Sequence, residues 1–171
     1  MKLNRHPPEW EAKLTTTTNS TDTYHLLGNL LHVHARSSDT GGAYSLVEEL
    51  TAPEAGAPPN RHPSDDEAFY VLEGIFEVEI EGEVIRAERG TFVQIPHGAV
   101  HAFRNVGSAP GRVLIINSPG KAHDSFFSEA GEPMPPGTRD LPLSSGLPDI
   151  PRLLEIGRRN GLEFLLPPQA T

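Results

Sequence analysis

Four side chains could bind a metal ion together: Asn60, His62 and Glu67 lie within eight residues, and His101 follows 34 positions after Glu67. Asn60 and His62 are two positions apart, so on an extended chain their side chains point to the same face. Two imidazoles and one carboxylate are a ligand set of non-haem iron(II), and they also suit manganese, nickel or zinc. These residues are therefore a candidate site for one divalent transition metal, Fe, Mn, Ni or Zn. The residue types alone leave the alternative that His62, in a loop of acidic residues, lies on the solvated surface.

Short strands separated by turns surround these residues. Residues Ile75–Ile80 alternate between apolar and acidic side chains, which predicts a half-buried strand with Phe76, Val78 and Ile80 facing inward. The pair Glu81-Gly82 predicts a tight hairpin turn. Further strands are expected over 24–35, 43–51, 68–73, 83–87, 91–95, 101–105 and 112–117, with a loop over 52–60. Because strands do not alternate with helices, the pattern predicts an all-β sandwich or barrel.

The character of the chain changes after Pro119. We expect a short helix over 123–130, a proline-rich connection over 132–148 and a helix over 150–160. Asp149 can cap the last helix, whose apolar stripe can pack on the barrel. The stripe comprises Ile150, Leu153, Leu154 and Gly157. We therefore divide the chain into an N-terminal arm (1–22), a β-barrel (23–119) and a C-terminal helical extension (120–171) packed outside the barrel.

Composition excludes several functions. The chain has 171 residues and a formal net charge of −9, and an acidic surface repels the phosphates of nucleic acids and anionic lipids. Its lack of cysteine removes thiolate ligands, cysteine nucleophiles and disulfides. No apolar run reaches the length of a membrane span, and the first residues lack the apolar core of a secretory signal. We expect a cytoplasmic protein that binds neither nucleic acid nor membrane.

The spacing around His101 matches a known motif. The second cupin motif places Gly, Pro-x-Gly, His and Asn at fixed intervals, and this chain has Gly90, Pro96, Gly98, His101 and Asn105 at those positions. The first cupin motif is His-x-His followed by Glu and then by Gly. His62, Glu67 and Gly74 meet its later intervals. The sequence thus resembles the cupin superfamily, and in particular the quercetin-dioxygenase-like cupins.

This resemblance implies a cupin-type antiparallel β-barrel (double-stranded β-helix, or jelly roll) and a homodimer formed through edge strands. It implies metal ligands at His62, Glu67 and His101. The first histidine of the His-x-His pair falls on Asn60, where this chain departs from the family pattern. An amide oxygen is a weaker ligand than imidazole for these metals, so we expect Asn60 to loosen the site.

Phe69 and Phe103 lie two residues beyond Glu67 and His101, so they share the inward direction of the ligands. They are expected to pack in the core and can line an apolar pocket for a small molecule. Three functions follow. The first is a metal-dependent dioxygenase of an aromatic, flavonol-like substrate, with Glu67 as catalytic base. The second is a metal-assisted isomerase or lyase. The third is a small-molecule binding or sensing protein whose metal site is degenerate or empty.

Overall fold

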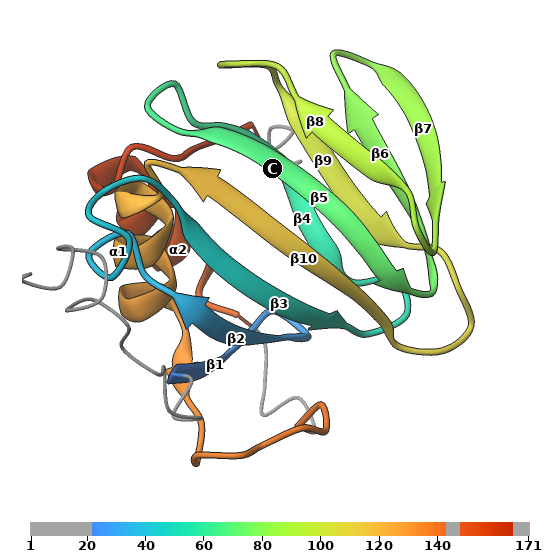
Figure 1. Cartoon of the computed structure of the whole chain (residues 1–171), viewed down its shortest axis with the longest axis horizontal. Coiled ribbons are helices and arrows are strands. Elements are labelled where there is room, and N and C mark those ends of the chain that lie inside the picture. The colour runs from blue at the N-terminus through green and yellow to red at the C-terminus, as the bar shows by residue number, and fades with distance from the viewer. Residues whose placement is uncertain (1–21, 143–147, 166–171) are drawn as a thin grey trace, which may run out of the picture.

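Alternating apolar and polar residues form short antiparallel strands, as the sequence predicts. The structure, a computed structural model, describes residues 22–142 and 148–165. Within these residues the strands form two sheets that face each other as a jelly-roll barrel (Figure 1). In spatial order, the first sheet contains β11 (Glu132–Pro133), β1 (Asp22–Leu26), β2 (Asn29–Ala35), β3 (Ser45–Thr51), β10 (Gly111–Ser118), β5 (Asp66–Glu73) and β8 (Phe92–Ile95). The second contains β12 (Glu163–Phe164), β4 (Gly56–Arg61), β9 (His101–Asn105), β6 (Ile75–Ile80) and β7 (Glu83–Glu88).

The core lies between the two sheets, where inward-facing side chains of both meet. Phe76 and Val78 are 1% and 2% exposed, which confirms the alternation predicted for this strand, and Ile80 is partly buried against the same cluster. The rings of Phe69 and Phe103 pack with their centroids 5.1 Å apart. Burying one such side chain stabilises the fold by roughly 1.5–3 kcal/mol, so these aromatic contacts rigidify the wall that carries the site.

One hairpin turn and one close approach of two strands depend on the properties of glycine. Glu81 and Gly82 both have positive φ, 50° and 86°, which is the geometry of the tight hairpin predicted between β6 and β7. Gly56 opens β4 with φ 155°, and a Cβ there would lie 2.0 Å from the carbonyl oxygen of Phe103. The missing side chain therefore lets β4 approach β9 closely, which brings His62 toward His101.

The structure corrects two sequence-based expectations. The strand expected over 24–35 is a hairpin of β1 and β2, broken at Leu27 and Gly28, which both have positive φ. The loop expected over 52–60 contains β4. This strand pairs with β9 through an irregular register, with a shift between Ala57 and Asn60, and with β12. Its two prolines lack amide hydrogens, so the sequence resembles a loop although the chain is extended.

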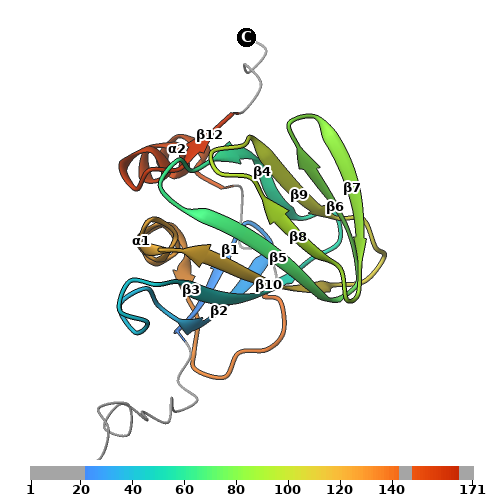
Figure 2. The same ribbon diagram turned by 45° about the horizontal axis from the view of Figure 1, so that its top comes forward.

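Two helices follow the barrel strands in the described part of the chain, α1 (Lys121–Ala130) and α2 (Ile150–Arg159). Figures 1 and 2 show them side by side at one end of the barrel. Asp149 caps α2 as predicted, because its carboxylate accepts a hydrogen bond of 3.0 Å from the backbone N–H of Arg152. The buried residues of α2 are Ile156 and Gly157, so its apolar stripe is centred further along the helix than predicted. In the described ranges neither helix is long and apolar enough to cross a membrane.

The C-terminal extension also contributes strands to both sheets. β11 pairs with β1 at the edge of the first sheet, and β12 pairs with β4 at the edge of the second. The extension is therefore joined to the barrel by backbone hydrogen bonds as well as by helix packing. The arm expected over residues 1–22 lies, apart from Asp22 in β1, outside the described residues.

Candidate metal centre

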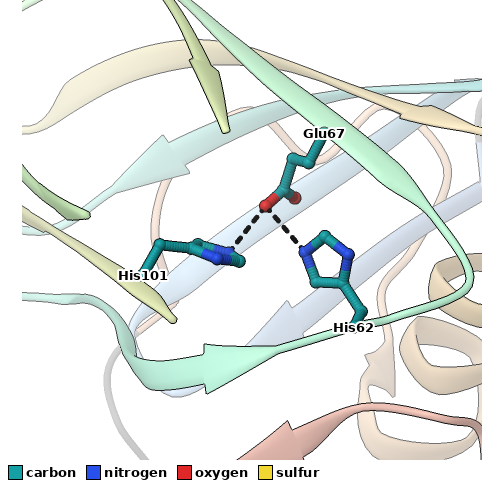
Figure 3. A group of neighbouring side chains, drawn as sticks. All are labelled: His62, Glu67 and His101. Carbon is teal, nitrogen blue, oxygen red and sulfur yellow. Dashed lines mark hydrogen bonds and ion pairs between the residues drawn. The ribbon is translucent and has the colours of Figure 1, made fainter. Parts of the chain in front are cut away.

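His62, Glu67 and His101 meet inside the barrel, as the sequence predicts (Figure 3). Their ligand atoms all lie within 4.8 Å of one another, and all three residues are buried. His62 follows the last residue of β4, Glu67 is on β5 and His101 begins β9. The group therefore draws on both sheets of the barrel. The antiparallel pairing of β4 with β9 brings His62 close to His101, and β5 brings Glu67 to them from the other sheet.

The Glu67 carboxylate is the centre of this group. Its Oε2 atom lies 3.1 Å from Nε2 of His62 and 2.8 Å from Nε2 of His101. Burial favours the neutral acid, but the hydrogen-bonding interactions with His101 and His62 outweigh it and hold the pKa of Glu67 well below its usual range. Burial also opposes protonation of His62, yet the interaction with Glu67 raises the pKa of this imidazole. Each group thus favours the charged form of the other.

In both His62 and His101, the hydrogen bond made by Nδ1 fixes the orientation of the ring and of Nε2. Nδ1 of His62 donates to the backbone carbonyl of Asp65 at 2.8 Å, and Nδ1 of His101 donates to that of Ala99 at 3.0 Å. A carbonyl oxygen only accepts, so both Nδ1 atoms carry the hydrogen. In the neutral rings, each Nε2 then turns a lone pair toward the Glu67 carboxylate. Two lone pairs facing an anion require a positive species between them, either protons or a metal cation.

These distances also suit a metal ion. Neighbouring ligands on a transition metal with bonds of about 2.1 Å lie roughly 3 Å apart, which is close to the two Nε2–Oε2 separations. Ligating histidines generally donate their other ring nitrogen to an oxygen atom, as His62 and His101 do here. The donor set and its hydrogen bonds therefore fit a divalent transition metal.

Asn60 is buried close to the site and is the register partner of His101 across β4 and β9. Its Nδ2 atom donates to the backbone carbonyls of Pro58, at 3.0 Å, and His101, at 3.3 Å. These bonds tie the Asn60 amide to the two strands that carry the histidines. Its predicted role as a weak ligand stays a prediction, while its observed contacts hold the strands in register.

Phe69 and Phe103 lie behind the ligands in the barrel wall. Phe69 packs with its ring centroid 6.5 Å from that of His101, and Phe103 packs against Phe69 and Phe76. Both are buried and form an apolar floor beneath the polar group. A groove of about 490 Å³ lies elsewhere, on the outer face of the second sheet, where Glu77, Ala102 and Arg104 are among its lining residues. We regard the barrel interior as the site because the converging ligands lie there.

Comparison with known proteins agrees with the fold. The Cupin_2 family, described as Cupin domain, matches residues 47–117. An uncharacterized protein of Streptomyces coelicolor is 32% identical over 91 residues, which cover 49% of this chain and 86% of that protein. The crystal structure of a predicted oxalate decarboxylase from Thermotoga maritima has a TM-score of 0.56 at 13% identity, covering 61% of this chain and 98% of that one.

This chain belongs to the cupin superfamily. Another relative of this cupin is the tetracenomycin polyketide synthase protein TcmJ of Streptomyces glaucescens, which is 31% identical over 96 residues. That alignment covers 56% of this chain and 63% of TcmJ. The polyketide synthase CurC of Streptomyces cyaneus is 42% identical over 60 residues, 34% of this chain and 38% of CurC. The cupin described here thus spans less than two thirds of the length of these two relatives.

Two residues at the site were missed by sequence reasoning. Asp65 and His123 are 2% and 4% exposed, and Nδ1 of His123 donates to Oδ2 of Asp65 at 2.8 Å. The His123 Nε2 atom lies 3.8 Å from Oε1 of Glu67. No local pattern links these residues, because helix α1 reaches the site only through the tertiary fold of the cupin. One signal was available in the sequence. His123 lies at the start of a helix that was expected to pack on the barrel.

Proposed function

We propose that this cupin is a metal-dependent enzyme whose small-molecule substrate binds in the barrel, with His62, Glu67 and His101 holding one divalent transition metal. One observation carries the proposal. The Nε2 atoms of His62 and His101 both lie close to Oε2 of Glu67, while the Nδ1 atom of each ring donates to a backbone carbonyl. A bound divalent ion would act as a Lewis acid on an oxygen atom of the substrate.

Glu67 is suited to both ligation and proton transfer. Its lowered pKa keeps the carboxylate ionised at neutral pH. The Oε2 atom contacts both imidazoles, whereas Oε1 has its nearest ion-pair contact at 3.8 Å, to His123. We infer that this carboxylate accepts the proton of a substrate hydroxyl group.

The barrel interior favours an aromatic substrate that carries polar groups. Phe69 and Phe103 provide an apolar surface next to His101. Asn117 lies opposite Glu67 across β10 and β5, and its buried amide has no hydrogen-bond partner among the described residues, so it can bind a substrate oxygen. The similarity to polyketide synthase proteins supports a substrate of this class. We propose oxygenation of a flavonol- or polyketide-like molecule.

The test combines metal analysis with oxygen uptake. Protein purified without a histidine tag should contain close to one equivalent of transition metal, and it should consume oxygen with one member of a panel of flavonols and hydroxylated polyketides. His101→Ala should lose both properties. His97→Ala is the matched control, because His97 is an exposed histidine that pairs with Asp66 at 2.8 Å outside the site. Substrate turnover without oxygen uptake would instead indicate the isomerase or lyase reaction.

A second candidate is a binding protein that works without metal. The amide of Asn60 donates hydrogen bonds to backbone carbonyls. The residue at one position of the family's ligand set therefore has a structural role. When His62 and His101 are protonated, the Glu67 carboxylate accepts from both, and the polar group is then satisfied without a cation. Metal content below about a tenth of an equivalent, together with tight binding of a panel compound by the metal-free protein, would favour this candidate.

A further inference from the structure

His123 brings a third imidazole to the site from outside the barrel sheets. It lies on helix α1, and its ring packs edge-on against His62 with the centroids 4.6 Å apart. The side chain is 4% exposed, and neighbouring Phe127 covers it further along the helix, at a centroid distance of 5.9 Å. Helix α1 thus places one buried imidazole directly against a residue of the metal centre.

Asp65 fixes the orientation of this ring. Its Oδ2 atom accepts the Nδ1–H of His123 at 2.8 Å, and the backbone N–H of Gly120 also donates to the carboxylate. The backbone carbonyl of Asp65 accepts the Nδ1–H of His62. One residue therefore holds both rings, His123 through its carboxylate and His62 through its backbone. A carboxylate on the far nitrogen of an imidazole is the usual support of a ligating histidine.

The free nitrogen of His123 faces the same carboxylate as the other two histidines. With the hydrogen on Nδ1, a neutral ring has a lone pair on Nε2, which lies 3.8 Å from Oε1 of Glu67. Ligand atoms that share one metal with bonds of about 2.1 Å are roughly 3.0 Å apart when adjacent and roughly 4.2 Å apart when opposite. The separation between Nε2 of His123 and Oε1 of Glu67 falls within this range. The closer group, whose ligand atoms all lie within 4.8 Å of one another, comprises His62, Glu67 and His101.

A purely structural histidine–aspartate pair accounts poorly for this arrangement. Burying two charged groups costs several kcal/mol per ion, which a single hydrogen bond seldom offsets. If His123 is neutral instead, its unprotonated Nε2 faces the Glu67 carboxylate. A metal cation shared by a neutral His123 and Glu67 removes this repulsion.

We propose that His123 is a further ligand of the metal centre, supplying the imidazole that Asn60 does not, and that Asp65 is its positioning residue. This inference rests on metal binding by His62, Glu67 and His101. The resulting set is three imidazoles and one carboxylate, assembled from the strands of the barrel and from helix α1.

Cobalt and copper serve as the probes. The affinity for Co²⁺ is measured by competition with a chromophoric chelator, together with the visible d–d bands of the bound ion, for the wild-type chain, His123→Ala and Asp65→Asn. We expect His123→Ala to weaken Co²⁺ binding by more than about 100-fold and to change the bands. Asp65→Asn should weaken it by about 10–100-fold with smaller band changes, as losses of supporting hydrogen bonds do. His97→Ala, at the exposed pair with Asp66, should leave both readouts unchanged.

A measurement on the wild-type chain makes the test independent of how the variants fold. Pulsed electron paramagnetic resonance of the Cu²⁺-loaded protein counts the coordinated imidazoles. Three imidazoles support the proposal, and two overturn it. If the wild type binds Co²⁺ and His123→Ala binds it equally well with the same bands, this inference fails while the proposed function stands. If the wild type binds neither ion, both fail.

Discussion

Asn117 lies directly opposite Glu67 across strands β10 and β5, and neither polar atom of its fully buried amide has a hydrogen-bond partner among the described residues. Side chains opposite each other on antiparallel strands share one face of the sheet, so the amide points into the barrel beside Glu67 of the candidate metal site. On its other side, across β10 and β3, the hydroxyl group of Ser45 also lacks a partner in the described chain. These groups form a polar row that is available to a ligand.

Replacing Asn117 with leucine should stabilise the free protein by about 1–3 kcal/mol, because an unpaired buried amide costs about that much. The same change should weaken binding of the substrate. Urea unfolding and ligand titration measure the two effects. Asn105→Leu is the matched control. Asn105 is equally buried, but its amide donates to Thr51 and Ala109 and accepts from Gly107, so its loss should destabilise the fold. Equal destabilisation by both variants would contradict this interpretation of Asn117.

Asn60→His should restore Co²⁺ binding to the His123→Ala variant. Position 60 is where the cupin pattern has an imidazole, and it lies on the strand that leads into His62. An added imidazole there would replace the one removed from helix α1. We expect recovery of at least about tenfold in affinity, comparable to a supporting interaction at a metal site, measured by chelator competition. An Asn60→Gln control keeps the amide and should give no recovery. If Asn60→His has no effect in either background, position 60 does not reach the metal.

The stability of the chain should fall as the pH rises, because of Glu49. This residue is buried in the first sheet, where burial raises its pKa to about 8 despite a hydrogen bond of 3.0 Å from Thr51. The unfolded chain releases this proton near the usual glutamate pKa, whereas the folded chain keeps it until about pH 8. The folded state therefore binds more protons between these values, and each pH unit in the window costs up to about 1.4 kcal/mol.

Glu49→Gln removes this titration. The variant should match the wild type near pH 4.5 and be more stable by a few kcal/mol at pH 8.5, as measured by urea unfolding at both values. The exposed Glu88 offers a control, because Glu88→Gln should leave the pH dependence of stability unchanged. Parallel wild-type and Glu49→Gln curves across this range would show that Glu49 ionises normally in the fold.

Metal removal should lower the melting temperature. A ligand at about 100 times its dissociation constant stabilises the folded state by about 2.7 kcal/mol, which corresponds to roughly 5–10 °C for a chain of this size. Calorimetry with and without a chelator measures the shift. His101→Ala should melt at the same temperature in both conditions, while His97→Ala should behave as the wild type does. A chelator effect that persists in His101→Ala would place the metal elsewhere.

The barrel and the convergence of its three candidate ligands could be predicted because their signals are local. The alternation around Phe76 and the fixed spacing around His101 each occupy a few consecutive positions, and both are confirmed by the structure. Strand β4 was predicted as a loop since Pro58 and Pro59 remove amide hydrogens from it. Its pairing with β9 depends on how closely the two backbones approach at Gly56.

The contributions of His123 and Asn117 could not be predicted in the same way. His123 contacts Asp65, 58 positions away in the sequence, only because helix α1 packs at the end of the barrel. Asn117 is the penultimate residue of the largely apolar strand β10, and its lack of partners is visible only once the neighbouring strands are in place. Both features arise from tertiary packing, for which short sequence patterns carry no signal.

Helix α1 also bears on how fast the site can be reached. His62, Glu67, His101 and His123 are each less than 8% exposed, and Phe126 and Phe127 of the helix are buried in the core. We expect a substrate that enters past this end of the barrel to wait for the helix to move before it reaches the candidate metal site. The observed rate of binding should then stop rising at high ligand concentration. Its plateau should equal the rate at which α1 opens.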